Sequence, residues 1–256
     1  MSKLSQLLRK FANRHDSSES GGQYMSKFRA SENNPPLPTS PLESIFYAHD
    51  GRTSDKWHHY FRIYEEEFGF IRRRDVKLLE IGVQAGGSLQ IWRKFLGEKA
   101  TIFGVDIDPN CRNLDTDDIC VRIGSQNDPE FLRRVVSEMG GLDIVIDDGS
   151  HIGSDQIASF KALFPLMATD GVYLIEDLQT AYWREYNGGV DREGTIVSFA
   201  KDLIDDLNGW YHHSPAKSLA TAKTEIGRIA FYNAIVAIRK SAGDSPQTVL
   251  TGDAVR

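Results

Sequence analysis

The 256-residue sequence has little cysteine, no excess of positive charge and no long hydrophobic segment. The spacing of its two cysteines, Cys111 and Cys120, suggests neither a metal knuckle nor a disulfide framework, which favours a reducing compartment over secretion. No apolar run approaches the roughly 20 residues that a membrane span needs, and the N-terminus lacks the core of a signal peptide. We therefore expect a cytoplasmic protein with no transmembrane segment.

Positive charge is in the minority, with 30 Lys and Arg residues against 36 Asp and Glu and a net charge of −6. Proteins that bind a phosphate backbone usually carry a basic face. The densest basic run, residues 72–74, fits the cationic end of a preceding helix. The composition thus argues against a nucleic-acid partner.

Three segments differ in composition. Residues 1–41 are predicted to be an N-terminal segment and linker, in which apolar residues at helical spacing are followed by Ser, Gly, Asn and Pro. The N-terminal helix could dock at a membrane surface or pack on its own protein or a sister subunit, so a homo-oligomer is one expectation. Residues 42–240 carry the folded domain, and residues 241–256 are predicted to form an unanchored tail.

Short apolar runs alternate with helical patterns between Val76 and Glu176, and two further apolar runs lie within Gly227–Lys240. This alternation predicts a Rossmann-like, doubly wound α/β fold, with a mostly parallel seven-stranded sheet and an antiparallel strand at one edge. Ahead of the first strand, aromatic residues at helical spacing predict a helix over Thr53–Phe68.

The first predicted strand runs into a glycine-rich turn, EIGVQAGGS, at Glu80–Ser88. Gly82 and Gly86 allow a tight turn and close backbone approach, and the next helix points its N-terminus at the loop, which suits a nucleotide or a carboxylate. The spacing is not GxGxxG, which argues against a dinucleotide-dependent reductase. Asp106, at the end of the second strand, is placed to accept ribose hydroxyls, with a plain turn residue as the alternative.

Carboxylates follow two neighbouring predicted strands. The first strand leads to Asp147, Asp148 and His151, and the second leads to Glu176 and Asp177. Open parallel sheets bind ligands in the crevice beyond the carboxyl ends of their strands, and grouped carboxylates suit a hard metal ion. The alternative is that these acids cap helices or form ordinary turns.

These motifs resemble those of a class I S-adenosylmethionine-dependent methyltransferase. EIGVQAGGS is similar to the family's first motif, and GVDIDPNC is similar to the acidic motif after its second strand. Within that superfamily, DDGSH followed by IEDLQTAYW resembles the metal-dependent sugar O-methyltransferases of macrolide biosynthesis, of the mycinamicin and demethylmacrocin type. The chain lacks the extra N-terminal domain that some of them carry, so the resemblance does not imply an acceptor as large as a macrolide.

The resemblance implies S-adenosylmethionine and Mg²⁺ as cofactors and assigns roles residue by residue. The metal ligands become Asp148, Glu176 and Asp177, and the general base becomes His151, with a structural hydrogen bond as the alternative for this histidine. A second resemblance, to the animal catechol O-methyltransferases, supports the register, because there an Asp ligand is followed three residues later by a catalytic Lys. The implied cofactor-binding residues are Glu80, Gly82, Gly86, Ser88, Asp106, Ser125, Gln126 and Asp147.

Within that set, Ser88 lies near the cofactor carboxylate, Asp106 on the ribose, and Ser125 and Gln126 near the adenine. The leading hypothesis is a Mg²⁺-dependent O-methyltransferase whose acceptor is a sugar hydroxyl of a glycan, a glycolipid or a glycosylated small molecule. Two alternatives stay open: a metal enzyme similar to the cephalosporin hydroxylases, and a non-catalytic protein that binds S-adenosylmethionine.

Overall fold

The computed structural model describes residues 36–72, 74–212 and 225–252. The helix and most of the linker that the sequence predicts within residues 1–41 lie outside this part of the chain. Helix α2 (Pro41–Tyr47) is capped by Ser40, whose hydroxyl accepts the amide N–H of Glu43 at 3.2 Å. Residues 241–252 contain no helix or strand.

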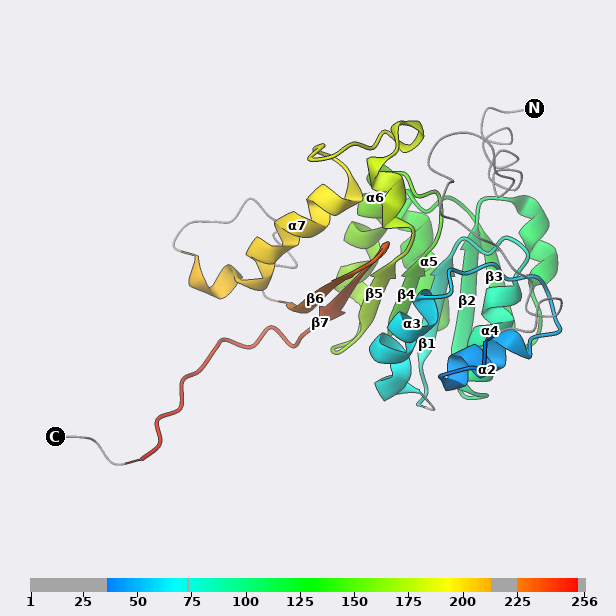
Figure 1. Ribbon diagram of the computed structural model, residues 1–256, viewed down its shortest axis with the longest axis horizontal. Coiled ribbons are helices and arrows are strands. Elements are labelled where there is room, and N and C mark those ends of the chain that lie inside the picture. Colours follow the sequence, from blue (N-terminus) through cyan, green and yellow to red (C-terminus); the bar gives the residue numbers. More distant parts are fainter. Residues whose placement is uncertain (1–35, 73, 213–224, 253–256) are drawn as a thin grey trace. The chain divides into compact units, whose positions relative to one another are not determined.

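Seven strands form one sheet in the order β3-β2-β1-β4-β5-β7-β6 (Figure 1). Their bounds are β1 Lys77–Ile81, β2 Thr101–Asp106, β3 Ile119–Ile123, β4 Ile144–Asp147, β5 Val172–Ile175, β6 Ile226–Tyr232 and β7 Ile235–Lys240. Strand β7 pairs antiparallel with both β5 and β6, so the other strands share one direction. The predicted fold class is confirmed, and the antiparallel strand lies one place in from the edge.

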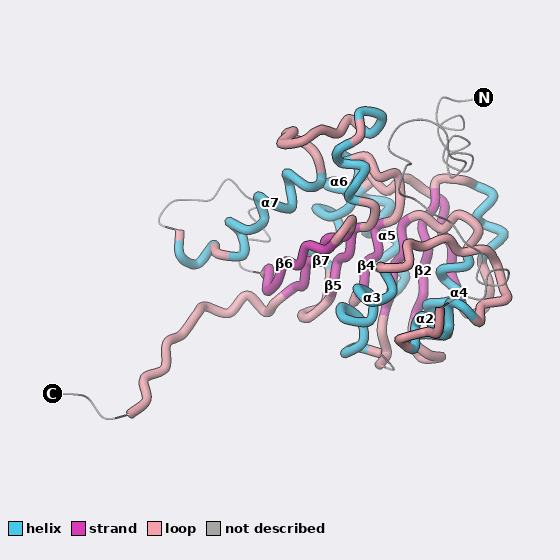
Figure 2. Tube along the Cα trace, viewed as in Figure 1, coloured by secondary structure: helices cyan, strands magenta, loops and turns pink. Residues whose placement is uncertain are grey.

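Helices cover both faces of this sheet (Figure 2). Besides α2 they are α3 Tyr60–Phe68, α4 Gly87–Leu96, α5 Pro129–Met139, α6 Gly153–Leu163 and α7 Ile196–Leu207. Along β1, Leu79 belongs to the core cluster shared with α5, α6 and α7, whereas Leu78 belongs to the cluster shared with α2, α3 and α4. The central strands are mostly apolar because both of their faces are buried.

The helix predicted over Thr53–Phe68 begins only at Tyr60, so the prediction was wrong for residues 53–59. Aromatic periodicity continues through this stretch, but contacts with α4 fix its backbone in another path. A Cβ on Gly87 would lie 2.2 Å from the carbonyl oxygen of Arg52, which shows how closely the two backbones pack. As a result, Lys56 is not on the helix surface and its side chain extends to the carboxyl edge of the sheet.

Parallel pairing brings the loops after β1, β4 and β5 to the same edge. Asp147 lies opposite Ile81 in β1 and Ile175 in β5. One residue further on, the amide of Asp148 donates to the Ile81 carbonyl at 2.9 Å, and the amide of Glu176 donates to the Asp147 carbonyl at 3.0 Å. The carboxylates that follow β4 and β5 therefore meet beside the glycine-rich turn that follows β1.

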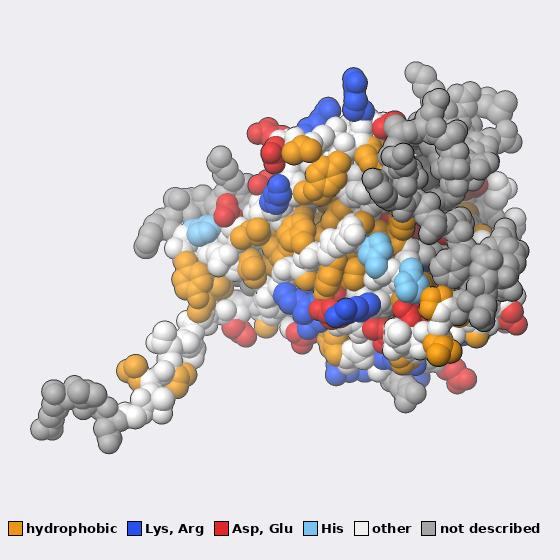
Figure 3. Space-filling model, viewed as in Figure 1, with side chains coloured by type: hydrophobic (Ala, Val, Ile, Leu, Met, Phe, Trp, Pro, Cys, Tyr) orange, Lys and Arg blue, Asp and Glu red, His pale blue; other side chains and the backbone are white. Residues whose placement is uncertain are grey.

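No helix among the described residues is long and apolar enough to cross a membrane. On the face shown in Figure 3, hydrophobic side chains gather in the region of strand β6, where Phe231 is 46% exposed. An apolar patch on the outer strand of the sheet agrees with the expected homo-oligomer, which stays a prediction.

Candidate active site

Two glycines give the turn after β1 its shape. Gly82 has φ +93° and Gly86 has φ +79°, backbone conformations that other residues rarely adopt. A Cβ on Gly82 would lie 2.1 Å from the carbonyl oxygen of Asp148, so the turn passes directly against the loop that follows β4. Helix α4 starts at the end of this turn and directs its N-terminus toward it.

Asp106 at the end of β2 is held by main-chain groups. One carboxylate oxygen accepts the amides of Val83 at 2.8 Å and Gln84 at 3.0 Å, and the other accepts the amide of Asp108 at 2.8 Å. The second oxygen has a further lone pair. This rigid, half-buried carboxylate can therefore also accept a hydroxyl from a ligand that lies over the turn.

Glu80 is buried beneath the same turn and accepts the hydroxyl of Ser88 at 2.8 Å. Burial raises the pKa of Glu80 to about 7, although the positive charge of Lys56 and the Ser88 hydroxyl oppose this shift. The structure thus places the Ser88 hydroxyl on Glu80. On the neighbouring loop, the hydroxyl of Ser125 donates to the side chain of Asn127 at 3.0 Å.

Asp147 is fully buried and accepts hydrogen bonds from three side chains. Its oxygens lie 2.6 Å from the Ser159 hydroxyl, 2.9 Å from the Tyr173 hydroxyl and 3.1 Å from the Gln126 amide nitrogen. The amide oxygen of Gln126 in turn accepts the Ser150 amide at 2.6 Å. Burial raises the pKa of Asp147 despite these donors. Gln126 and Asp147, which the resemblance assigns to the cofactor, therefore bond to each other beneath the loop that follows β4.

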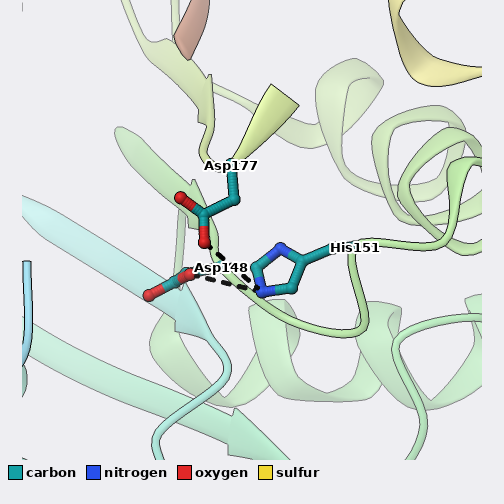
Figure 4. A group of neighbouring side chains, drawn as sticks. All are labelled: Asp148, His151 and Asp177. Carbon is teal, nitrogen blue, oxygen red and sulfur yellow. Dashed lines mark ion pairs between the residues drawn. The ribbon is translucent and has the colours of Figure 1, made fainter. Parts of the chain in front are cut away.

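Asp148, His151 and Asp177 point toward one another at the carboxyl edge (Figure 4). His151 Nε2 lies 3.8 Å from Asp148 Oδ1 and 3.9 Å from Asp177 Oδ2. One potential ligand atom of each of the three residues lies within 4.8 Å of the others, and carboxylate oxygens are the hard ligands that Mg²⁺ prefers. His151 and Asp177 both have positive φ, +55° and +56°, which is strained for non-glycine residues and is typical of functional loops.

A lysine that no sequence pattern predicted completes the cluster. Lys56 Nζ lies 2.5 Å from Asp148 Oδ2, 2.8 Å from Glu176 Oε2 and 3.8 Å from Glu80 Oε1. Only 6% of its side chain is exposed. Burial opposes the ammonium charge, but the surrounding carboxylates outweigh it and hold the pKa of Lys56 well above its ordinary value. A single lysine in an aromatic-rich stretch carries no motif that would have predicted this position.

Aromatic side chains from the same segment donate to the two acids after β5. The Tyr64 hydroxyl donates to Glu176 Oε1 at 2.6 Å, while Asp177 Oδ1 accepts the Tyr60 hydroxyl at 2.7 Å and the Trp57 ring N–H at 3.2 Å. These residues were expected only as the apolar face of a helix. Their polar ends instead orient both carboxylates.

The two acids differ in charge balance. Burial and the neighbouring Asp148 raise the pKa of Glu176 despite Lys56 and Tyr64. Burial also opposes ionisation of Asp177, but His151 and the Tyr60 hydroxyl hold its pKa below the ordinary value. Asp148, Glu176 and Asp177 thus gather at one edge of the sheet around a single ammonium, a set of oxygen donors that suits a divalent cation.

The loop at residues 181–194 lines a cavity of about 180 Å³. The cavity also borders the first turns of α6 and α7, and its lining residues include Ile152, Tyr186, Asn187 and Arg192. Tyr186 contacts His151, with 6.5 Å between the ring centroids. The space thus adjoins the histidine side of the cluster.

Comparisons with known proteins match this arrangement. Residues 79–178 match the model of a family described as a methyltransferase domain. The fold is shared with the MycE methyltransferase of the mycinamycin biosynthetic pathway, solved in complex with Mg, SAH and mycinamycin VI. That structure has a TM-score of 0.72 and 32% sequence identity, over 83% of this chain and 57% of MycE. The chain therefore contains a class I methyltransferase domain.

Characterised relatives of this methyltransferase domain are sugar O-methyltransferases. The chain is 40% identical over 198 residues to the 8-demethyl-8-(2-methoxy-alpha-L-rhamnosyl)-tetracenomycin-C 3'-O-methyltransferase of Streptomyces olivaceus, and the match covers 72% of this chain and 50% of that protein. It is 36% identical to the mycinamicin VI 2''-O-methyltransferase of Micromonospora griseorubida, over 71% and 48% of the two chains. The chain thus spans about half the length of these relatives.

Proposed function

We propose that this protein is a Mg²⁺-dependent O-methyltransferase that transfers the methyl group of S-adenosylmethionine to a sugar hydroxyl. The observation that carries the proposal is the contact between the two halves of the site. Gly82 in the glycine-rich turn packs directly against Asp148, the first acid of the cation cluster. A methyl donor over the turn and an acceptor at the cluster would therefore be neighbours.

The turn after β1 holds the methyl donor in this proposal. Gly82 and Gly86 let the cofactor approach the backbone, and Asp106 accepts hydroxyls of the ribose. Glu80 and Ser88 shape the buried end of the turn, and Ser125 lies in the loop after β3. Gln126 and Asp147 support the loop from below, because their side chains bond to each other.

The acids after β4 and β5 bind and activate the acceptor. Asp148, Glu176 and Asp177 are the proposed Mg²⁺ ligands, and the bound ion would lower the pKa of a sugar hydroxyl and fix its oxygen. In this proposal His151, whose Nε2 lies 3.8 and 3.9 Å from the two aspartates, would take the hydroxyl proton as the oxygen bonds to the methyl group, the bond from sulfur to that methyl breaks and S-adenosylhomocysteine leaves. Methyl transfer then needs little beyond in-line placement of donor and acceptor.

The acceptor is proposed to be a small molecule that carries a sugar. The cavity beside His151 presents the polar side chains of Asn187, Arg192 and Glu193 together with the ring of Tyr186. Hydrogen-bonding groups beside an aromatic ring suit the alternating polar and apolar surfaces of a sugar. The names of the relatives, all sugar O-methyltransferases, support the same class of acceptor.

A labelled-methyl assay tests this function. The protein is incubated with methyl-labelled S-adenosylmethionine and a panel of rhamnosylated, other glycosylated and glycolipid acceptors, with Mg²⁺ or with EDTA. We expect a product heavier by one methyl group that EDTA abolishes and added Mg²⁺ restores. Transfer that is insensitive to EDTA would contradict the metal role, and a product that gains oxygen would contradict methyl transfer.

A further inference from the structure

Both carboxylate oxygens of Glu176 already have a hydrogen-bond partner in this structure. Oε1 accepts the Tyr64 hydroxyl at 2.6 Å, and Oε2 lies 2.8 Å from the ammonium of Lys56. The same ammonium lies 2.5 Å from Asp148 Oδ2. A cation held jointly by these two acids would need the place that the Lys56 ammonium already occupies.

We propose that Lys56 is a built-in cation that occupies the metal position between Asp148 and Glu176 in the metal-free protein and withdraws when a divalent ion binds. This inference rests on the proposed metal-dependent function and adds a competitor that sets the metal affinity. The ammonium keeps the acids together in the absence of metal, because its charge offsets the repulsion between buried carboxylates. Each binding event must then displace it, which weakens the apparent affinity for Mg²⁺.

Three features of the described residues support this role. Lys56 lies beside Asp148 and Glu176, and His151 lies beside Asp148 and Asp177, so several carboxyl groups share a single ammonium. Exchange of the ammonium for a divalent ion brings the cluster nearer to neutrality. The preference for a doubly charged occupant therefore follows from the charges themselves.

The path of the chain also permits withdrawal. Lys56 lies in residues 53–59, which form no helix, and its four-carbon stem has many rotamers, so the ammonium can move without unwinding α3. The side chains of Asp148 and Asp177 are 23% and 22% exposed. Solvent therefore reaches the cluster at the side opposite the buried Glu176.

Calorimetric titration with Mg²⁺ tests the competition in the full-length protein. Lys56→Met keeps the stem but removes the charge, and we expect it to bind Mg²⁺ at least about tenfold more tightly than the wild type. Its metal-free form should unfold at a lower temperature, and saturating Mg²⁺ should restore more of that loss than it does for the wild type. Unchanged or weaker Mg²⁺ binding by Lys56→Met would overturn the proposal.

Lys240→Met is the matched control, because this lysine is also buried and pairs with Glu225 at 3.3 Å, away from the site. Its Mg²⁺ affinity should equal that of the wild type. A parallel gain in both variants would mean that the effect is unspecific.

Amine labelling of the wild type shows whether Mg²⁺ displaces the Lys56 ammonium or whether the two cations only repel each other. We expect Lys56 to be protected from an acylating reagent without metal and to react several-fold faster with saturating Mg²⁺, as read from peptide masses. Lys240 should react at the same rate in both states. Equal protection of Lys56 with Mg²⁺ bound would show that the ammonium stays in place, and would overturn the proposal even if Lys56→Met did not fold.

These outcomes are separable from the proposed function. If the wild type methylates sugars in a Mg²⁺-dependent way while Lys56 stays protected, only this inference fails. If Lys56 is displaced by Mg²⁺ but no acceptor is methylated, only the proposed activity fails.

Discussion

The two halves of the site are held together in different ways. The cofactor half, which comprises residues 80–88 and Asp106, is fixed by main-chain geometry: the Asp106 carboxylate binds amides 22 and 23 residues earlier in the chain. The cation half, which comprises Asp148, His151, Glu176 and Asp177, is fixed by side chains 92 to 120 residues away, among them Lys56 and Tyr60. The cofactor half is formed by the end of β1, the turn after it and the end of β2, whereas the cation half depends on how residues 53–68 (the α3 segment) pack against the sheet edge.

This difference has a physical consequence. The cofactor half is held mainly by backbone hydrogen bonds, so it should keep its shape whatever cation is present. The cation half contains a buried excess of acid, so its geometry should respond to charge. Changes in one half should therefore leave binding in the other half largely intact, and four substitutions test this separation.

Asp148→Asn should have the largest effect on activity. It removes one charge from the cluster and one partner of Lys56, so Mg²⁺ affinity should be lost and turnover should fall roughly 10³-fold or more, since a metal ion supplies several kcal/mol of transition-state stabilisation. Affinity for S-adenosylmethionine should stay within about twofold. Calorimetry and labelled-methyl kinetics measure the two quantities. Asp191→Asn, at an exposed acid of the nearby loop, is the control and should behave as the wild type.

His151→Ala should lower turnover by about 10²-fold or more, the usual contribution of a general base, while both Mg²⁺ and S-adenosylmethionine still bind. Single-turnover methyl transfer and calorimetry on the same sample give the comparison. A fall in Mg²⁺ affinity as large as the fall in turnover would assign His151 to the metal or to the structure of the loop.

Asp147→Ala should act on stability, in contrast to the same substitution at Asp148. It leaves the buried donors Ser159, Tyr173 and Gln126 without their acceptor, so the free energy of unfolding should fall by about 2–4 kcal/mol. Urea unfolding of the two metal-free variants measures the difference. Retained stability with lost S-adenosylmethionine affinity would instead make Asp147 a direct cofactor contact.

Asp106→Asn should have the smallest effect and confine it to the cofactor half. Its carboxylate accepts three amides and, in our proposal, ribose hydroxyls, so S-adenosylmethionine affinity should fall about tenfold, which corresponds to the loss of one charged hydrogen bond. Titration of Mg²⁺ into the same variant should give the wild-type affinity. Coupled losses of both affinities would show that the two halves are not independent.

The same contrast explains what could be predicted from the sequence. The sheet and the glycine-rich turn depend on patterns that are local in sequence, and the structure contains both of them. The acids after β4 and β5 could be brought together because parallel strands share a carboxyl edge.

Lys56 and the donating roles of Tyr60 and Tyr64 could not be predicted in this way. Their partners lie more than 90 residues away, and the approach depends on residues 53–59 leaving the helical path. The sequence pattern also could not predict that Asp147 is buried whereas Asp148 is partly exposed. Adjacent strand residues point to opposite sides, but only the packed side chains decide which acid becomes a buried acceptor.

The contacts of Tyr60 have one more consequence, for how such sites can be exchanged between proteins. Residues 79–178 match the family model, yet the Tyr60 hydroxyl joins Asp177 to the carbonyl of Ala234, so the cation half is tied to segments on both sides of that match. A chimera that transplants only residues 79–178 would inherit the methyl-donor turn and the acids but not the side chains that aim them. To move the metal-dependent half of the site into another protein of this family, residues 53–68 and the β6–β7 hairpin would therefore have to be transplanted together with residues 79–178.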